Sequence, residues 1–259
     1  MKLLILGGTT EASSLARALA NRTDLEPILS LAGRTMSPAL PPIPHRVGGF
    51  GGVAGLAGYL RREAVDAVVD ATHPFAARIS ANAAEACTTL GLPLMVFSRP
   101  PWFAGPHDDW TFVADMDEAA RALGDAPRHV LLTVGRLDLA AFKAMPQHHY
   151  LVRTIDPPQG DDLPPDHMLI VGRGPFRLDE EQALMRDERI EVLVTKNSGG
   201  TAAAAKLEVA RMLGVPVIVV ERPPTAATRN ETGSLAEVLD WIEARRRTPP
   251  LSLVATGLT

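Results

Sequence analysis

The chain has 259 residues, of which 46% are hydrophobic, 22% charged and only 5% aromatic. This composition is typical of a globular protein with a substantial core and excludes a disordered or fibrous chain. The formal net charge of −4 argues against a general nucleic-acid or acidic-membrane binder, because such binding needs an excess of basic residues.

Cysteine content and hydropathy both favour the cytoplasm. Cys87 is the single cysteine, so the chain cannot form an internal disulfide or a multi-cysteine metal site. The apolar run Leu3–Leu6 is too short for the core of a signal peptide. No uncharged apolar run reaches the length of about 18 residues that a membrane-spanning helix needs. We therefore expect a cytoplasmic protein that does not enter a membrane.

Short apolar runs alternate with helix-spaced patterns from the N-terminus onward. This rhythm is typical of βαβ units whose parallel strands are buried on both faces. It predicts strands at 3–6, 27–31, 67–69 and 94–97, a helix after Gly8, and helices at about 56–62 and 76–90. The proline-rich loop at 38–44 cannot be helical, and the stretch near Val47 has only a weak pattern.

Paired prolines at Pro100 and Pro101 interrupt this rhythm and force an extended connection, so a domain boundary is expected after Arg99. At roughly 100–200 residues per domain, the length also favours two domains. The second half predicts strands at 130–134, 150–155, 168–171, 192–195 and 217–220, and a last helix at about 235–246. The expected organisation is an α/β fold with domains at 1–99 and 100–247, mainly parallel sheets flanked by helices, and a flexible tail at 248–259.

The first predicted strand runs into the segment Gly7-Gly8-Thr9-Thr10-Glu11. Two glycines followed by hydroxyl residues at a strand-to-helix junction expose backbone N–H groups at the positive end of a helix, which suits a dinucleotide pyrophosphate. The segment does not match G-x-G-x-x-G in full, so a tight turn with a helix cap remains the alternative.

The second strand ends in Gly33-Arg34-Thr35, and no Asp or Glu occurs between Glu26 and Glu63. NAD sites usually place a carboxylate near this strand end, whereas NADP sites place an arginine there for the 2′-phosphate. The segment therefore favours NADPH. The alternative is that Arg34 is a solvated loop residue.

A further strand ends in Asp70-Ala71-Thr72-His73-Pro74, at the sheet edge where open α/β sheets bind ligands. If Pro74 lies in the first helical turn, Thr72 and His73 project from the rim of the crevice. His73 would then supply a proton, or would hold the nicotinamide or the substrate by hydrogen bonding. The alternatives are a capping or packing role for His73 and a loop-holding role for Asp70.

Five segments, in this order, resemble motifs of the precorrin-6A reductases of cobalamin biosynthesis, a family that includes the cobalt-precorrin-6A reductases. They are Leu4–Ala12, Ser30–Thr35, Asp70–Ala76, Gly172–Phe176 and Thr195–Gly200. The resemblance spans residues 1 to about 243. It implies two Rossmann-like lobes and an NADPH-dependent reduction of a carboxylated, tetrapyrrole-derived macrocycle to precorrin-6B, without flavin or metal. It also leaves room for handover to neighbouring pathway enzymes.

The segment Lys196-Asn197-Ser198-Gly199-Gly200 follows a strand and precedes an Ala-rich helical pattern. We expect it to aim helix N–H groups, together with the Lys196 charge, at a carboxylate or phosphate. A glycine-rich turn with an exposed lysine is the alternative. Arg136, Arg173 and Arg177 also lie next to strand ends, so with Lys196 they would form a positive wall for the peripheral carboxylates of a macrocycle in the interlobe cleft.

These expectations define the candidate sites. The cofactor site comprises Gly7, Gly8, Thr9, Thr10, Glu11, Gly33, Arg34, Thr35 and Thr72, the substrate site comprises Arg136, Arg173, Lys196, Asn197, Ser198 and Gly199, and His73 is the catalytic candidate. Two other functions remain open: an NADPH-dependent reductase of a smaller substrate, and a nonenzymatic two-lobed sensor of a nucleotide or carboxylate. The sequence also leaves open whether the macrocycle contains cobalt.

Overall fold

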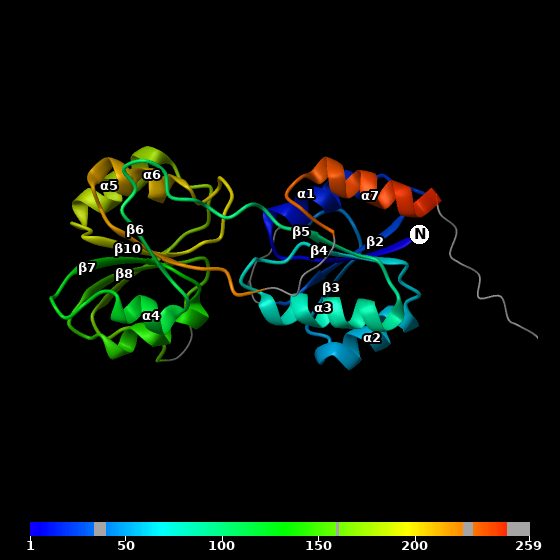
Figure 1. The fold of residues 1–259 in the computed structure, drawn as a ribbon, viewed down its shortest axis with the longest axis horizontal. Coiled ribbons are helices and arrows are strands. Elements are labelled where there is room, and N and C mark those ends of the chain that lie inside the picture. The colour runs from blue at the N-terminus through cyan, green and yellow to red at the C-terminus, as the bar shows by residue number, and fades with distance from the viewer. Residues whose placement is uncertain (34–39, 159–160, 225–229, 248–259) are drawn as a thin grey trace, which may run out of the picture. The chain divides into compact units, whose positions relative to one another are not determined.

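In the computed structural model, the described residues are 1–33, 40–158, 161–224 and 230–247. They form two units that each contain a six-stranded sheet (Figure 1). Unit 1 holds residues 1–33, 40–99 and 230–247, and unit 2 holds the described residues between 100 and 224. Every neighbouring pair of strands in both sheets is parallel. Among the described residues, no helix is long and apolar enough to cross a membrane.

The sheet of unit 1 has the strand order β12-β5-β4-β1-β2-β3, which is the doubly wound order of Rossmann-like domains. Its strands are β1 (Lys2–Leu6), β2 (Glu26–Leu31), β3 (His45–Val47), β4 (Ala67–Asp70), β5 (Leu94–Phe97) and β12 (Glu231–Thr232). Helices α1 (Thr10–Leu19) and α7 (Leu235–Arg247) cover one face, and α2 (Gly52–Arg62) and α3 (Ala77–Leu90) cover the other (Figure 1).

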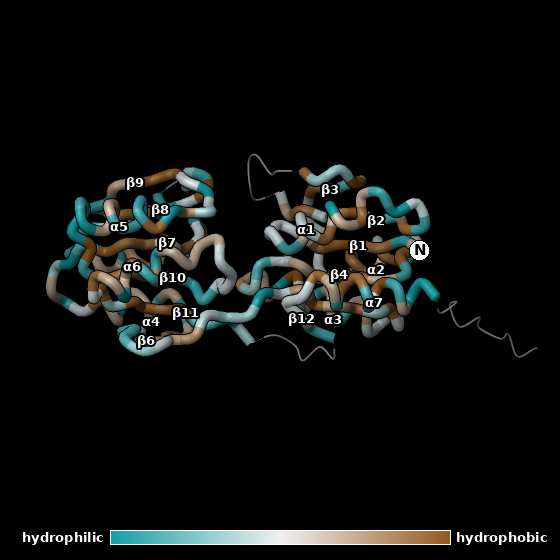
Figure 2. The backbone as a smooth tube through the Cα atoms, turned by 90° about the horizontal axis from the view of Figure 1, so that it is seen from above, coloured by the Kyte–Doolittle hydropathy of each residue, from teal (hydrophilic) through white to brown (hydrophobic). Residues whose placement is uncertain are grey.

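Successive side chains of β1 point to opposite faces of the sheet and are apolar on both, which explains why helices cover both faces. Leu3 and Ile5 belong to the core beneath α1 and α7, whereas Leu4 and Leu6 belong to the core beneath α2 and α3. Figure 2 shows the resulting hydrophobic stretches along β1 and β4. The Cys87 thiol lies in the second core, where burial raises its pKa to about 12. A thiol in this state packs as an apolar side chain.

Unit 2 repeats this architecture with the order β6-β11-β10-β7-β8-β9. Its strands are β6 (Trp110–Val113), β7 (His129–Thr133), β8 (His149–Thr154), β9 (His167–Val171), β10 (Val192–Lys196) and β11 (Val217–Val220). Helices α5 (Leu178–Asp187) and α6 (Ala205–Leu213) cover one face, and α4 (Met116–Arg121) and the 3-10 helix η1 (Arg136–Ala144) cover the other.

The C-terminal segment corrects the predicted domain limits. Along the described residues, the chain first changes unit between Arg99 and Pro100, where the sequence placed the boundary, but β12 and α7 return to unit 1. Strand β12 pairs with β5, and Val238, Trp241 and Ile242 of α7 pack into the core that contains α1. The apolar stripe of α7 predicts that the helix is buried but does not specify which sheet buries it. The predicted tail, 248–259, lies outside the described residues.

Three strands differ from the sequence prediction. β6 and β12 were not predicted, and β3 forms where only a weak pattern was noted. All three lie at sheet edges, where side chains are less buried: Phe112 of β6 is 44% exposed and Val47 of β3 is 58% exposed. Edge strands lack the continuous hydrophobic run that identifies a central strand, so their sequence signal is weak.

Candidate functional site

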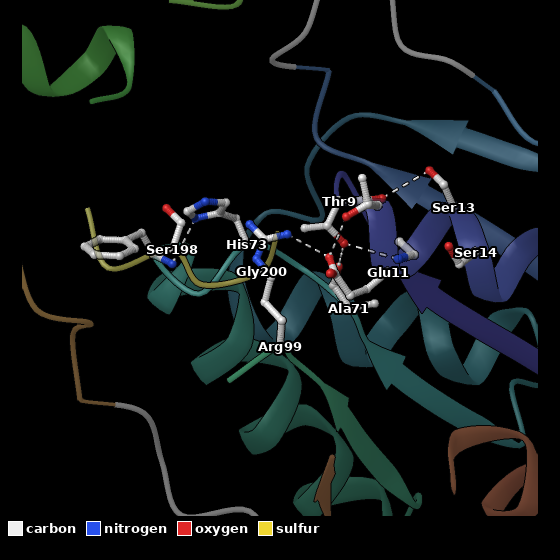
Figure 3. Close-up of polar contacts among 12 residues, drawn as sticks. Thr9, Glu11, Ser13, Ser14, Ala71, His73, Arg99, Ser198 and Gly200 are labelled. Atoms are coloured by element: carbon white, nitrogen blue, oxygen red, sulfur yellow. Dashed lines mark hydrogen bonds and ion pairs between the residues drawn. The ribbon is translucent and has the colours of Figure 1, made fainter. Parts of the chain in front are cut away.

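The site in unit 1 lies where β1 and β4 are neighbours, at the carboxyl ends of the two strands. In open α/β sheets, ligands bind at this topological switch point. The loop after β1 contains Thr9, and the loop after β4 contains Ala71. The Thr9 hydroxyl donates a hydrogen bond to the Ala71 carbonyl at 2.7 Å and so ties the two loops together (Figure 3).

The backbone of the loop after β1 can be approached closely by a ligand. Gly8 has a φ of +119°, a conformation that favours glycine. Thr9 caps α1, because its hydroxyl accepts the N–H of Ala12 at 3.2 Å. The N–H groups of Thr10 and Glu11 donate to no acceptor within the described part of the chain. The tight turn with a helix cap is therefore present, and it leaves backbone donors open for an anion.

Glu11 places a carboxylate beside these donors, and Arg99 pairs with it. Arg99 Nη1 lies 2.9 Å from Glu11 Oε2, and both side chains are more than four-fifths buried (Figure 3). Thr10 donates to the same oxygen at 3.1 Å. The ion pair offsets a negative charge that would otherwise repel a phosphate. Sequence reasoning used Arg99 only as a domain limit. Its position just after the carboxyl end of β5 was the available signal.

Asp70 organises the loop after β4. Its carboxylate is 3% exposed, and Oδ1 accepts both the N–H of Thr72 at 3.1 Å and the hydroxyl of Thr72 at 2.7 Å. This confirms the loop-holding interpretation of Asp70. Because its hydroxyl is fixed in this way, Thr72 has a defined orientation at the switch point.

His73 lies in the same loop, ahead of α3. Its Nδ1 accepts the N–H of Phe75 at 3.2 Å, so the neutral ring carries its proton on Nε2. The prediction that Pro74 lies in the first helical turn is wrong, because α3 begins at Ala77. The N–H of Ala76 instead bonds to the His73 carbonyl at 2.7 Å, which closes a separate turn before the helix.

The end of β2 is described only as far as Gly33. Gly33 has a φ of +74°, and a Cβ there would lie 2.9 Å from Val47 Cγ1. Arg34 and Thr35 lie outside the described residues. Among the residues that the structure describes, Arg46 is a cationic side chain near this strand end. Its Nη1 donates to Ser30 Oγ at 2.8 Å and to the Gly48 carbonyl at 2.9 Å.

In unit 2, the corresponding switch point lies between β7 and β10. Lys196 ends β10, and its Nζ pairs with Asp138 Oδ2 at 2.5 Å. Asp138 belongs to η1, which Arg136 opens directly after β7. Two of the predicted substrate residues therefore lie at neighbouring strand ends. Asp138 was not predicted, because the contact joins strands that are distant in sequence.

The glycine-rich loop after β10 differs from its prediction. It does not open a helix, since α6 begins only at Ala205. Both polar atoms of the Asn197 amide pair with the backbone of Trp102, at 2.7 and 3.1 Å. Gly199 has a φ of +69°, and a Cβ there would lie 2.0 Å from the Pro100 carbonyl oxygen. Arg222 donates to the carbonyls of Asn197 and Ser198 at 2.9 and 3.2 Å. The loop therefore holds the segment at Pro100–Trp102.

Arg173 follows β9 and is exposed. β9 is the edge strand, separated from β7 by β8. The structure thus brings Arg136 and Lys196 to one switch point and places Arg173 farther along the same sheet edge. The cations of the predicted positive wall are therefore spread along the carboxyl ends of the strands. Asp138 offsets the charge of Lys196.

Three charged side chains are buried together behind this row. Arg153 of β8, Glu181 of α5 and Lys206 of α6 are each at most 7% exposed. Arg153 forms a two-bond ion pair with Glu181, with 3.1 Å between Nη2 and Oε2. Lys206 Nζ lies 5.6 Å from the ring centroid of Trp102. Burial, reinforced by the Arg153 charge and opposed by Glu181, lowers the pKa of Lys206 to about 7.

Replacing Lys206 with Met is expected to stabilise the fold at neutral pH. Between pH 7 and about 10.5, the unfolded chain carries the lysine proton and the folded chain does not, so wild-type stability rises with pH across this window. The slope from this group is about 1.4 kcal/mol per pH unit. The free energy of unfolding of Lys206→Met should lack this slope. The variant should therefore exceed the wild type in stability most at pH 7 and below, and the difference should vanish near pH 10. Urea unfolding at several pH values measures this, and parallel curves for the two proteins would contradict it.

The comparisons with known proteins agree on one family. The family model described as "Precorrin-6x reductase CbiJ/CobK" matches residues 2–243. A precorrin-6A reductase of Rhodobacter capsulatus is 49% identical over 248 residues, which cover 96% of this chain and 98% of the relative. A precorrin-6A reductase of Mycobacterium tuberculosis is 45% identical, with 93% and 97% covered. The solved structure "CobK precorrin-6A reductase" superposes with a TM-score of 0.90 at 49% identity, covering 96% of this chain and 99% of that one.

Proposed function

This chain belongs to the precorrin-6x reductase CbiJ/CobK family, and we propose that it reduces precorrin-6A to precorrin-6B in cobalamin biosynthesis, with NADPH as the reductant. The strongest support is near-complete coverage: relatives named precorrin-6A reductase match 93–96% of this chain, through both units. The open backbone donors after β1 add independent support for a nucleotide-dependent reaction.

The residues of unit 1 fit a dinucleotide. The N–H groups of Thr10 and Glu11, at the positive end of α1, would hold the pyrophosphate, and Gly8 would allow its close approach. Arg99 keeps Glu11 neutralised, so that the anion meets no unpaired carboxylate. When bound, the nicotinamide would supply the hydride to the conjugated macrocycle.

His73 is proposed to act as a hydrogen-bond donor through Nε2. Because Nδ1 accepts the Phe75 N–H, the ring is held in one orientation with its second nitrogen as the donor. In this role His73 would hold the nicotinamide amide or a polar group of the substrate. Thr72, fixed by Asp70, would border the same position.

The strand ends of unit 2 are proposed to bind the substrate carboxylates. Arg136 and Lys196 share the switch point, and Arg173 extends the row toward the sheet edge. Charge-assisted contacts of this kind recognise carboxylates despite the net negative charge of the chain. Asn197, Ser198 and Gly199 would support these contacts through the shape of their loop, since the Asn197 side chain is engaged with Trp102.

Replacing Lys196 with Ala is expected to raise the KM for precorrin-6A by roughly tenfold, the size of one charge-assisted contact. Affinity for NADPH, measured without substrate, should stay near the wild-type value, because Lys196 belongs to unit 2. Asp138→Asn is the matched variant. It removes the carboxylate that pairs with Lys196 and should not raise KM. Loss of NADPH binding in a folded Lys196→Ala protein would contradict the assignment of the nucleotide to unit 1.

An anaerobic assay with precorrin-6A and NADPH tests the proposed function directly. Nicotinamide absorbance and macrocycle absorbance should bleach in step. Parallel reactions with the cobalt form of the substrate distinguish the two substrate classes. NADPH binding without oxidation would favour a nonenzymatic sensor, and turnover of NADPH only with smaller substrates would favour a different reductase.

A further inference from the structure

The loop Gly172–Phe176, which carries Arg173, is attached to unit 2 at both ends. The N–H of Gly172 donates to the Thr154 carbonyl at 2.9 Å, beside the end of β8. The N–H of Phe176 donates to the Ala202 carbonyl at 3.4 Å. The second bond is long, so the position of this end depends strongly on what holds the Phe176 side chain.

The Phe176 ring rests on a buried charge. The guanidinium carbon of Arg153 lies 4.0 Å from the ring centroid, within the range of a cation–π contact. Glu181 binds two nitrogens of the same guanidinium and therefore fixes the plane on which the ring lies. Arg153 and Glu181 come from β8 and α5, two elements of the rigid core.

Stability alone does not account for this ion pair. Arg153 is 7% and Glu181 is 2% exposed, and burying two charges costs about as much as their attraction returns. Apolar side chains of similar size would fill the same space without that cost. A flat cation beneath Phe176 is what apolar side chains could not supply.

We infer that Arg153, held by Glu181, is a positioning residue for the substrate: through Phe176 it fixes the loop Gly172–Phe176 and thereby places Arg173 at the carboxyl ends of the strands. This inference rests on the proposed function, because it assigns Arg173 to substrate carboxylates. Arg153 itself is buried and acts only through the ring.

Hydrogen exchange tests the positioning without any assay of activity. Phe176→Leu removes the ring and keeps the buried ion pair, and it should raise exchange at the amides of Gly172 and Phe176 by roughly tenfold or more. Phe176→Tyr keeps the ring and should exchange as the wild type does. Lys206→Met removes a different basic side chain from the same cluster and should leave both amides unchanged. Equal loosening by Phe176→Leu and Lys206→Met would overturn the inference.

Steady-state kinetics test the consequence for the substrate. Phe176→Leu should raise the KM for precorrin-6A roughly 10- to 30-fold, with kcat changed by no more than about twofold and NADPH affinity unchanged. The apolar pair Arg153→Met with Glu181→Met should keep the wild-type Tm and show the same KM increase. If that double variant does not fold, Phe176→Leu decides alone. An unchanged KM in Phe176→Leu overturns the inference, whereas a wild-type protein that does not reduce precorrin-6A overturns the proposed function and leaves the exchange result standing.

Discussion

Replacing His73 with Asn is expected to slow single-turnover reduction roughly 10²- to 10³-fold, the cost of removing one well-placed hydrogen-bond donor from a reaction site. The Asn oxygen can still accept the Phe75 N–H in place of Nδ1, so the loop and the fold should survive. What is lost is the donor at the position of Nε2. Rapid mixing of enzyme, NADPH and precorrin-6A with excess enzyme measures the rate of this step.

The matched variant is His73→Gln, whose amide nitrogen can replace Nε2 but whose oxygen does not replace Nδ1. It should retain more of the single-turnover rate than His73→Asn does. The opposite order would show that the Phe75 contact matters and that His73 is a structural cap. A role as proton donor from the imidazolium would need a proton on Nδ1, which accepts the Phe75 N–H.

Replacing Arg34 with Ala is expected to weaken NADPH binding by roughly ten- to a hundredfold while changing NADH binding little. Arg34 follows the end of β2, where dinucleotide sites meet the 2′ position of the ribose, and no carboxylate lies nearby in sequence. Binding titrations with both nucleotides, without substrate, measure the ratio. Equal losses for NADPH and NADH would contradict a contact with the 2′-phosphate.

Arg46 provides the control for this assignment. Its guanidinium is engaged with Ser30 and Gly48 and lies 4.0 Å from the ring centroid of Phe50. Because these contacts organise the backbone after β3, Arg46→Ala should weaken both nucleotides equally. A loss confined to NADPH in Arg46→Ala would move the 2′-phosphate from Arg34 to Arg46.

The sequence predicts the parts of this fold that local physics determines. Central strands such as β1 and β10 are continuous apolar runs, and Thr9 caps a helix because a hydroxyl there satisfies an open N–H. Contacts between distant segments carry no such signal. Asp138 reaches Lys196 only because β7 and β10 are neighbours in the sheet.

The largest differences have the same origin. A glycine-rich turn before an Ala-rich segment has the pattern of a helix start, but Gly199 is required by its approach to Pro100 and the helix begins later. Arg153, Glu181 and Lys206 are scattered charges in the sequence, and only the packing of β8, α5 and α6 gathers them. Charged residues are mostly exposed, so sequence reasoning passes over the few that are buried.

The return of β12 and α7 to unit 1 reverses the usual order of assembly during translation. Domains generally fold from the N-terminus as the chain leaves the ribosome. Here the first unit to begin is the last to be completed, because its sixth strand and the Trp241 side of its core are encoded after all the described residues of unit 2. Until those residues emerge, β5 is an open sheet edge and the apolar face of α1 is partly uncovered, features that promote aggregation. In a nascent chain arrested before β12, unit 2 should therefore resist protease, whereas unit 1 should still be cleaved.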